Sequence, residues 1–215
     1  MNENLTEIVA ILDRSGSMEH LTNDTIGGFN SFLKEQIEIP GEAILTTVLF
    51  NDSYMLLHDR ENINRIKPIT RKEYIAQGST ALLDAMGKTI NDIGLKLLNT
   101  VENERPCKVI FFIITDGEEN ASVEFTNEKI KEMVELQKNT YGWEFIFLGA
   151  NIDSFSTASA LGISANRSFD YEADEEGVVS VQMAMSAAVG NLRRHRNVDA
   201  IEGIDYRKKI KKPKK

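Results

Sequence analysis

The sequence predicts an α/β protein with a mainly parallel sheet, helices on both faces and one antiparallel hairpin strand. Uninterrupted apolar runs at residues 8–12 and 110–114 are typical of strands buried on both faces, as in a parallel sheet. Such runs alternate with segments of roughly ten to twenty residues in which apolar side chains recur at helical spacing. The alternation indicates strands connected by helices that pack back onto the sheet.

The first half of the chain contains two strand patterns, one helix pattern and one hairpin. The expected elements are a strand over 8–12, a helix over 21–36, a strand over 43–50 and a hairpin strand over 54–58. Asp24 is expected to cap the helix, which Pro40 and Gly41 terminate. Residues 60–77 are polar with scattered apolar anchors and are expected to form an irregular crossing.

The second half repeats the alternation. The expected elements are a helix over 81–98, a strand over 108–115, a helix over 127–138, a strand over 143–149, a short helix over 151–161, a short strand over 163–170 and a helix over 178–194. The strand over 108–115 is the most apolar and is expected to lie centrally. The residues after this last helix are expected to form a flexible arm.

Composition favours one cytoplasmic domain. The 215 residues suffice for one sizeable α/β domain, and 41% hydrophobic and 27% charged residues are ordinary for a globular protein. No apolar run approaches the ~20 residues that a membrane span needs. The first residues lack the basic and apolar regions of a secretory signal, and the single cysteine, Cys107, excludes an internal disulfide.

Charge is distributed unevenly. The net charge is −8, but residues 207–215 hold seven of the 25 Lys and Arg residues and no acidic ones. Residues 1–206 therefore carry 18 basic and 33 acidic residues, a formal charge of −15. An acidic body disfavours binding to a phosphate backbone and attracts cations, although the basic tail could associate weakly with nucleic acid or another anionic partner.

Oxygen-bearing side chains follow the two most apolar strands. Asp13 ends the first run and Ser15 and Ser17 follow it, whereas Asp116 and Gly117 follow the run at 110–114. Ligands of open α/β sheets bind beyond the carboxyl ends of the strands. Carboxylates and hydroxyls are hard donors that suit Mg²⁺ or Mn²⁺ and suit Zn²⁺ poorly.

Asp-x-Ser-x-Ser, a later lone Thr and an Asp after a strand form the metal-ion-dependent adhesion site of the von Willebrand factor A (vWA) domain. The sequence resembles this family, in its single-domain bacterial and phage form, over nearly the whole chain. The matching positions are Asp13, Ser15, Ser17, Thr80 and Asp116. The resemblance implies a three-layer Rossmann-like fold with a six-stranded sheet, a vWA domain over 1–200 and a flexible basic tail over 201–215.

The resemblance also implies roles for the five residues. Ser15 and Ser17 would coordinate Mg²⁺ or Mn²⁺, rather than Ca²⁺, directly. Thr80 would join them in a ligand-ready state, and Asp13 and Asp116 would often bind through water. One position would stay open for an Asp or Glu of a protein partner, and the expected setting is a multi-protein assembly.

Each of these residues also has a purely structural interpretation. Thr80 could be only an N-cap, Ser17 only a turn residue, and Asp13 and Asp116 only polar strand ends. Near Thr80, Asp84 could support the site or lie on a solvated face. Residues 118–120 could line the rim of the site or form a simple acidic loop.

Two other function classes compete with a binding module. A phosphatase of the haloacid-dehalogenase type also uses a strand-ending Asp near Mg²⁺, but it needs a second carboxylate where this chain has Ser15. No Gly-x-Ser-x-Gly elbow of a serine hydrolase surrounds Ser15 or Ser17. We therefore expect no enzymatic activity. Nucleic-acid association is expected only as a weak property of residues 207–215.

Overall fold

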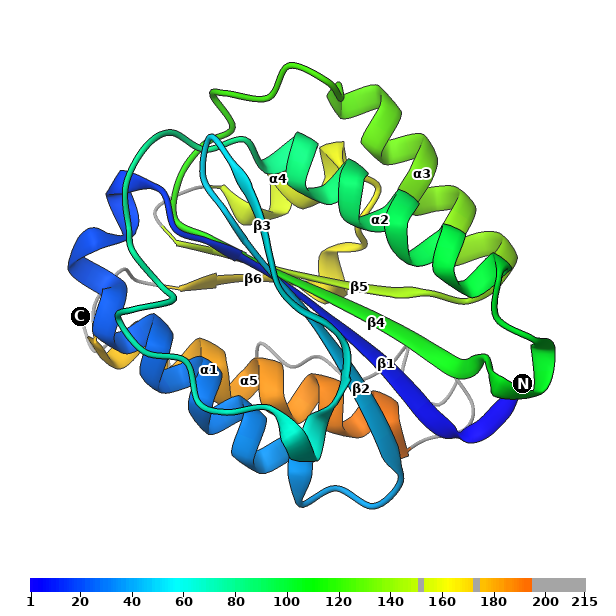
Figure 1. The fold of residues 1–215 in the computed structure, drawn as a ribbon. Coiled ribbons are helices and arrows are strands. Elements are labelled where there is room, and N and C mark those ends of the chain that lie inside the picture. The colour runs from blue at the N-terminus through cyan, green and yellow to red at the C-terminus, as the bar shows by residue number, and fades with distance from the viewer. Residues whose placement is uncertain (151–152, 172–174, 195–215) are drawn as a thin grey trace.

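Six strands form one sheet in the order β3-β2-β1-β4-β5-β6 in the computed structural model, which describes residues 1–150, 153–171 and 175–194 (Figure 1). The strands are β1 (Asn2–Asp13), β2 (Glu42–Phe50), β3 (Tyr54–Asn62), β4 (Pro106–Thr115), β5 (Glu144–Ala150) and β6 (Ser168–Tyr171). All neighbouring strands pair in parallel except β2 and β3, which pair antiparallel. The predicted mainly parallel sheet with one antiparallel edge strand is therefore confirmed.

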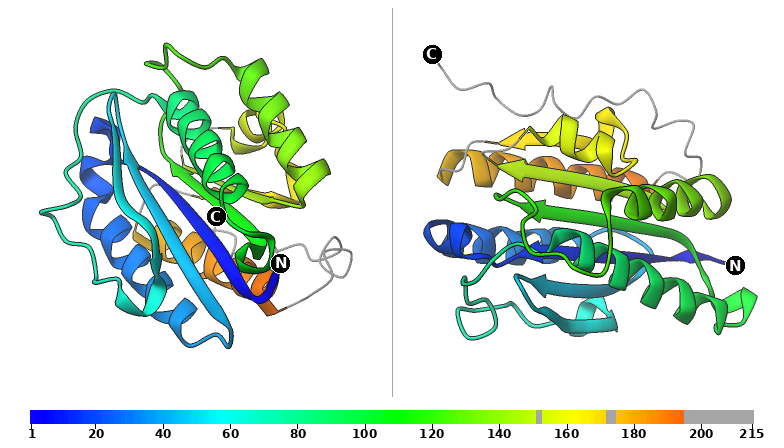
Figure 2. Two further views of the ribbon diagram at one scale, coloured as in Figure 1. Left: turned by 45° about the vertical axis from the view of Figure 1, so that its right-hand side comes forward. Right: turned by 90° about the horizontal axis from the view of Figure 1, so that it is seen from above.

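Helices cover both faces of this sheet (Figures 1 and 2). They are α1 (Thr22–Ile37), α2 (Leu82–Leu98), α3 (Asn127–Tyr141), α4 (Ser154–Ala160) and α5 (Glu175–Arg194). Helices α1 and α5 lie side by side below the sheet in Figure 1, and α2, α3 and α4 lie above it. The three-layer arrangement that the resemblance implied is confirmed.

Strand β1 shows why the apolar runs form central strands. Residues 8–12 are all 0% exposed. Ile8, Ala10 and Leu12 pack in the core shared with α1 and α5, while Val9 and Ile11 pack in the core shared with α2 and α3. Burying each large aliphatic side chain contributes about 1.5–3 kcal/mol, so a run without polar residues is stabilised on both faces.

Several boundaries differ from the predicted ones. Strand β1 begins at Asn2 rather than at residue 8, and β3 continues to Asn62 rather than ending at 58. Strand β3 is an edge strand whose side chains are mostly half-buried or exposed, so its second half lacks the apolar pattern that marks a strand. Part of the predicted helix over 151–161 lies outside the described residues; α4 begins at Ser154.

The prediction that Asp24 caps the first helix is wrong. A short 3₁₀ turn over Gly16–Leu21 precedes α1, and the cap position of α1 falls on Leu21. Asp24 therefore lies inside the first turn, where a carboxylate still interacts favourably with the helix dipole.

The predicted basic tail over 201–215 and the predicted domain end at residue 200 lie outside the described residues. Within the part of the chain that is described, no helix is long and apolar enough to cross a membrane.

A buried ion pair lies at the middle of β1. Glu7 is 0% exposed, and Arg60 Nε donates to its Oε1 at 2.9 Å. Burial raises the pKa of Glu7 above its usual value, although the Arg60 guanidinium acts to lower it. Arg60 adopts a φ of 51°, an uncommon conformation for a residue with a side chain, and its N–H donates to Thr46 Oγ1. The backbone of β3 is thus bent where Arg60 reaches the buried carboxylate.

Helices α1 and α5 approach each other closely at Gly28. A Cβ atom on Gly28 would lie 1.4 Å from Cδ of Gln182, whose Nε2 donates to the Asp24 carbonyl oxygen at 2.9 Å. Next to it, Gly27 has open space: a Cβ there would meet no atom of the described residues within 4 Å. The two neighbouring glycines therefore have different structural roles.

We predict opposite effects of alanine at these two positions. Gly27→Ala should raise the free energy of unfolding by about 0.5–1 kcal/mol, because alanine loses less backbone entropy in a helix. Gly28→Ala should lower it by about 1–2 kcal/mol, because Gln182 must move and lose its hydrogen bond. Urea unfolding of both variants checks this, and equal midpoints would contradict the close contact.

Candidate metal centre

The loop after β1 turns sharply at the carboxyl edge of the sheet, toward which the arrows of the parallel strands point in Figure 2. The Ser15 N–H donates to Asp13 Oδ1 at 2.7 Å, which closes an Asx turn. The following 3₁₀ turn is anchored by Met18, which is 1% exposed. This turn leaves Ser17 exposed, whereas Asp13 and Ser15 are buried.

Hydrogen bonds connect four of the five predicted site residues. Ser15 Oγ lies 3.0 Å from Ser17 Oγ, and Ser17 Oγ donates to Asp116 Oδ1 at 2.6 Å. Together with the Asx turn at Asp13, these contacts bring the ends of β1 and β4 together. The sequence motif thus corresponds to one continuous group of oxygen atoms.

Thr80 completes this group from the loop that precedes α2. A Cβ atom placed on Gly117 would lie 3.2 Å from Thr80 Oγ1 and 3.4 Å from Ser17 Oγ, so both hydroxyls border the space that the glycine leaves open. Thr80 is 3% exposed. It is not the N-cap of α2, because that helix begins at Leu82 and its cap position is Ala81.

One oxygen of this group is unsatisfied. Asp116 Oδ2 is buried and receives no hydrogen bond from any residue that the structure describes. A buried carboxylate oxygen without a partner is costly, and a cation or water would relieve that cost. The residues present therefore fit a small, hard divalent ion, to which three hydroxyls and two carboxylates can contribute oxygens.

The donor set contains little charge. No three His, Cys, Asp or Glu side chains come together as a metal cluster anywhere among the described residues. Asp13 and Asp116 are the only anionic members of the five predicted ligands. A cation held mainly by neutral hydroxyls keeps much of its positive charge.

Two further side chains hold Asp13 in place and were not identified from the sequence. Thr115 Oγ1 donates to Asp13 Oδ2 at 2.6 Å, and the buried Tyr74 hydroxyl donates to the Asp13 carbonyl oxygen. Thr115 could have been found from the sequence, because it directly precedes Asp116 at the end of a strand that was expected to lie centrally. That strand, β4, pairs with β1. Tyr74 lies in the irregular crossing, and no sequence pattern indicated its role.

Burial shapes the acidity of the site. It raises the pKa of Asp13 to about 6, although hydrogen bonds from Thr115 and Ser15 act in the opposite direction. Burial also raises the pKa of Asp116, against the effects of the Ser17 hydrogen bond and of the nearby His20. Both carboxyls thus hold a proton more tightly than usual when no cation is present.

The other acidic residues considered near the site differ in their exposure. Asp84 is 7% exposed and bonds the backbone of residues 123–125 instead of the five predicted site residues; it does not lie on a solvated face. Glu118 is exposed beside the site. A shallow cavity lined by Lys138, Trp143 and Arg167, among others, lies where β5 begins, at the opposite edge of the sheet.

Comparison with known proteins places this geometry in a fold family. No model of a known protein family matches the sequence, and no curated protein matches it. Solved structures do match. The vWF domain of the type V pilus tip protein Mfa5 from Porphyromonas gingivalis aligns with a TM-score of 0.62 and 9% identity, over 92% of this chain and 99% of that one.

Two longer proteins match as well. Proximal thread matrix protein 1 from the mussel byssus, with a zinc-occupied MIDAS motif, has a TM-score of 0.61 and 14% identity over 87% of this chain. The pilus adhesin SpaC from Lactobacillus rhamnosus GG has a TM-score of 0.64 and 12% identity over 89% of this chain. The chain spans 46% of the mussel protein and 31% of the adhesin.

The chain has the von Willebrand factor A fold. The sheet order and the antiparallel edge strand agree with this assignment. In this vWA fold the five oxygen-bearing residues lie together at the carboxyl edge of the sheet.

We predict a pH-dependent loss of stability in the metal-free protein. Because folding raises the pKa of Asp13 from 3.8 to about 6, the folded protein binds this proton more tightly than the unfolded chain. The resulting stabilisation is complete below pH ~4 and is lost as the pH rises through about 6, an effect of about 3 kcal/mol.

The measurement is chemical unfolding in chelator from pH 4 to pH 7, with Asp13→Asn as the control. The amide of this variant cannot titrate, so the variant should lose less stability over that range than the wild type. Identical pH profiles for the two proteins would show that Asp13 does not carry the effect.

Proposed function

We propose that the protein is a Mg²⁺-dependent binding module that engages an acidic residue of a protein partner. Ser15, Ser17 and Thr80 would hold the ion through their hydroxyls, with Asp13 and Asp116 as its anionic neighbours. The bound ion supplies an electrophilic position for the partner's carboxylate. Mn²⁺ is the expected alternative ion.

The observation that carries this proposal is the unsatisfied Oδ2 of Asp116 beside the Ser17 and Thr80 hydroxyls. If protein donors satisfied every oxygen of the Asp13 and Asp116 carboxylates, neither carboxylate would need a cation. Here one buried oxygen accepts nothing from the described residues, and the neighbouring donors are neutral. A hard cation satisfies this oxygen and remains attractive to an external anion.

The structural neighbours support the proposal by analogy. A MIDAS motif holds zinc in the mussel thread protein, and the neighbours include a pilus tip protein and a pilus adhesin. We infer divalent-metal binding and a protein partner for this chain, with Mg²⁺ favoured by its oxygen donors. Cytoplasmic location and membership of a bacterial or phage assembly stay predictions from the sequence.

We further propose that the protein is not an enzyme. A phosphatase nucleophile needs a free carboxylate oxygen, but Asp13 accepts hydrogen bonds through Oδ1 from Ser15 and through Oδ2 from Thr115. The general-acid position two residues later is Ser15, which is 2% exposed. These contacts make Asp13 an orienting group.

Calorimetric titration of Mg²⁺ and Mn²⁺ into chelator-treated protein tests the metal site. We expect binding by the wild type and strong weakening, by about tenfold or more, in Asp13→Ala and Thr80→Val. Valine has nearly the volume of threonine, so Thr80→Val removes the hydroxyl with little change in packing. Thr80→Ser keeps the hydroxyl and should retain binding.

Each variant must remain folded by circular dichroism for this comparison. Wild-type protein that binds neither ion would contradict the proposed metal site. Equal affinities of Thr80→Val and Thr80→Ser would remove Thr80 from the ligand set while leaving the other donors in place.

Peptides that each contain one Asp or Glu can test the proposed partner chemistry. Peptides bound in Mg²⁺ should be released by chelator, and replacement of their acidic residue by the matching amide should abolish binding. Thr80→Val protein should not bind them. Peptide binding that survives both chelator and amide replacement would contradict recognition of a carboxylate through the metal.

A further inference from the structure

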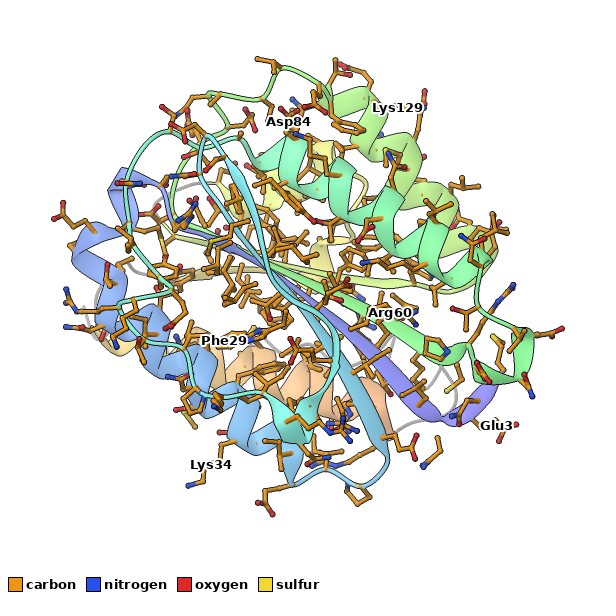
Figure 3. All side chains as sticks on the ribbon, in the orientation of Figure 1. Glu3, Phe29, Lys34, Arg60, Asp84 and Lys129 are labelled. Carbon is orange, nitrogen blue, oxygen red and sulfur yellow. The ribbon has the colours of Figure 1, made fainter. Side chains whose placement is uncertain are left out.

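The segment over residues 118–125, between β4 and α3, is bonded to the start of α2. It begins two residues after Asp116, which directly follows β4, and passes the loop that carries Thr80. Figure 3 shows Asp84 near the start of α2, beside this segment. Four polar side chains, those of Asn120, Glu119, Ser122 and Asp84, connect the segment to α2 and to the loop before it, and each does so through backbone groups.

Asn120 makes the contact with Thr80. Thr80 N–H donates to Asn120 Oδ1 at 2.9 Å, and Asn120 N–H donates to the Thr80 carbonyl oxygen at 3.0 Å. Both backbone hydrogen-bonding groups of Thr80 are therefore used by one residue. Asn120 therefore ties the Thr80 backbone to the segment that follows Asp116 and helps to set where the Thr80 hydroxyl lies.

Glu119 holds the adjoining residues. Its Oε1 accepts from the N–H groups of Ala121 and Ser122, and its Oε2 accepts from Leu83 N–H at 2.9 Å and from Ser122 Oγ at 2.8 Å. Leu83 lies in the first turn of α2, where backbone N–H groups have no partner within the helix. Glu119 thus caps α2 from another segment.

Asp84 makes the reverse contact. Its carboxylate accepts from the N–H groups of Val123, Glu124 and Phe125 at 2.9–3.0 Å. Burial opposes ionisation, but these backbone hydrogen bonds lower the pKa of Asp84 below its usual value. The carboxylate is therefore ionised at neutral pH, when charge-assisted hydrogen bonds are strong.

Apolar packing adds to this polar connection. A Cβ atom on Gly87 would lie 2.4 Å from the Phe125 ring, so the ring lies directly on the backbone of α2. The segment is therefore held to α2 by both polar and apolar contacts.

On its other side, the Thr80 loop is bonded to the ends of β1 and β2. Gly16 N–H donates to the Gly78 carbonyl oxygen at 2.9 Å, and Ala81 N–H donates to the Asn51 carbonyl oxygen at 3.0 Å. These bonds do not involve Asn120. Loss of the Asn120 side chain would leave the loop attached to β1 and β2 and would keep the backbone bond from residue 120 to the Thr80 carbonyl oxygen, but the Thr80 N–H would lose its acceptor on the Asp116 side.

We infer that Asn120 is a positioning residue that holds Thr80 for metal binding, and that Glu119 and Asp84 fix the segment that presents Asn120. This inference rests on the proposed function. A neutral amide suits the role, because its oxygen accepts the Thr80 N–H without adding negative charge beside the ion. The site is thereby held ready for the cation.

The test compares Asn120→Ala with Asn30→Ala. Asn30 binds both backbone groups of Ile69, each at 2.9 Å, and neither residue is one of the five predicted site residues. Asn30→Ala removes both of these side-chain hydrogen bonds, so it costs at least as many hydrogen bonds as Asn120→Ala, which removes the bond from the Thr80 N–H. We expect Asn120→Ala to weaken Mg²⁺ or Mn²⁺ binding by about tenfold to a hundredfold and Asn30→Ala to leave it nearly unchanged.

Hydrogen exchange of the metal-free protein gives a second readout. The Thr80 amide should lose protection in Asn120→Ala and keep it in Asn120→Asp, which retains an acceptor oxygen. Thermal unfolding of all variants shows whether a change in affinity merely follows a loss of global stability.

The outcomes distinguish the two proposals. Wild-type binding with equal affinity in Asn120→Ala would overturn the positioning role and leave the proposed function intact. Unchanged Thr80 protection in Asn120→Ala would overturn it as well. A wild type that binds neither ion would overturn both the proposed function and this inference.

Discussion

The burial of the Asp13 carboxylate at the end of β1 is the constraint on which the site depends. A fully buried carboxylate is costly unless its oxygens receive hydrogen bonds. Its two oxygens receive hydrogen bonds from Ser15 in the next loop and from Thr115 of β4, and Tyr74 of the irregular crossing donates to the backbone carbonyl oxygen of the same residue. Satisfying the polar groups of Asp13 therefore fixes how three segments meet, and the hydroxyls of the donor set follow from that arrangement.

The sequence was sufficient for the central part of the fold and for the five-residue group. Continuous apolar runs identify β1 and β4 because both faces of these strands are buried, and their carboxyl ends adjoin in a parallel sheet. It was insufficient for Asn120 and Tyr74, whose bonds to Thr80 and Asp13 span 40 and 61 residues. No local periodicity encodes such contacts, because they depend on how loops pack.

Element boundaries were missed for a related reason. The second half of β3 is held by pairing with β2, so its side chains need no apolar pattern. Asp24 resembles a cap in sequence, but the 3₁₀ turn anchored by Met18 moves the start of α1 to Thr22. In both cases tertiary contacts override a local preference.

Strand β1 carries two buried carboxylates, Glu7 in its middle and Asp13 at its end, and the two are neutralised differently. Glu7 has a fixed counter-ion, Arg60, held within the chain. Asp13 forms no salt bridge with any basic side chain in the described residues. On the proposed function its counter-ion is exchangeable and comes from solution. The middle of the strand would thus be indifferent to the ionic medium, while its carboxyl end would make the molecule's local electrostatic field depend on the free divalent-ion concentration around it.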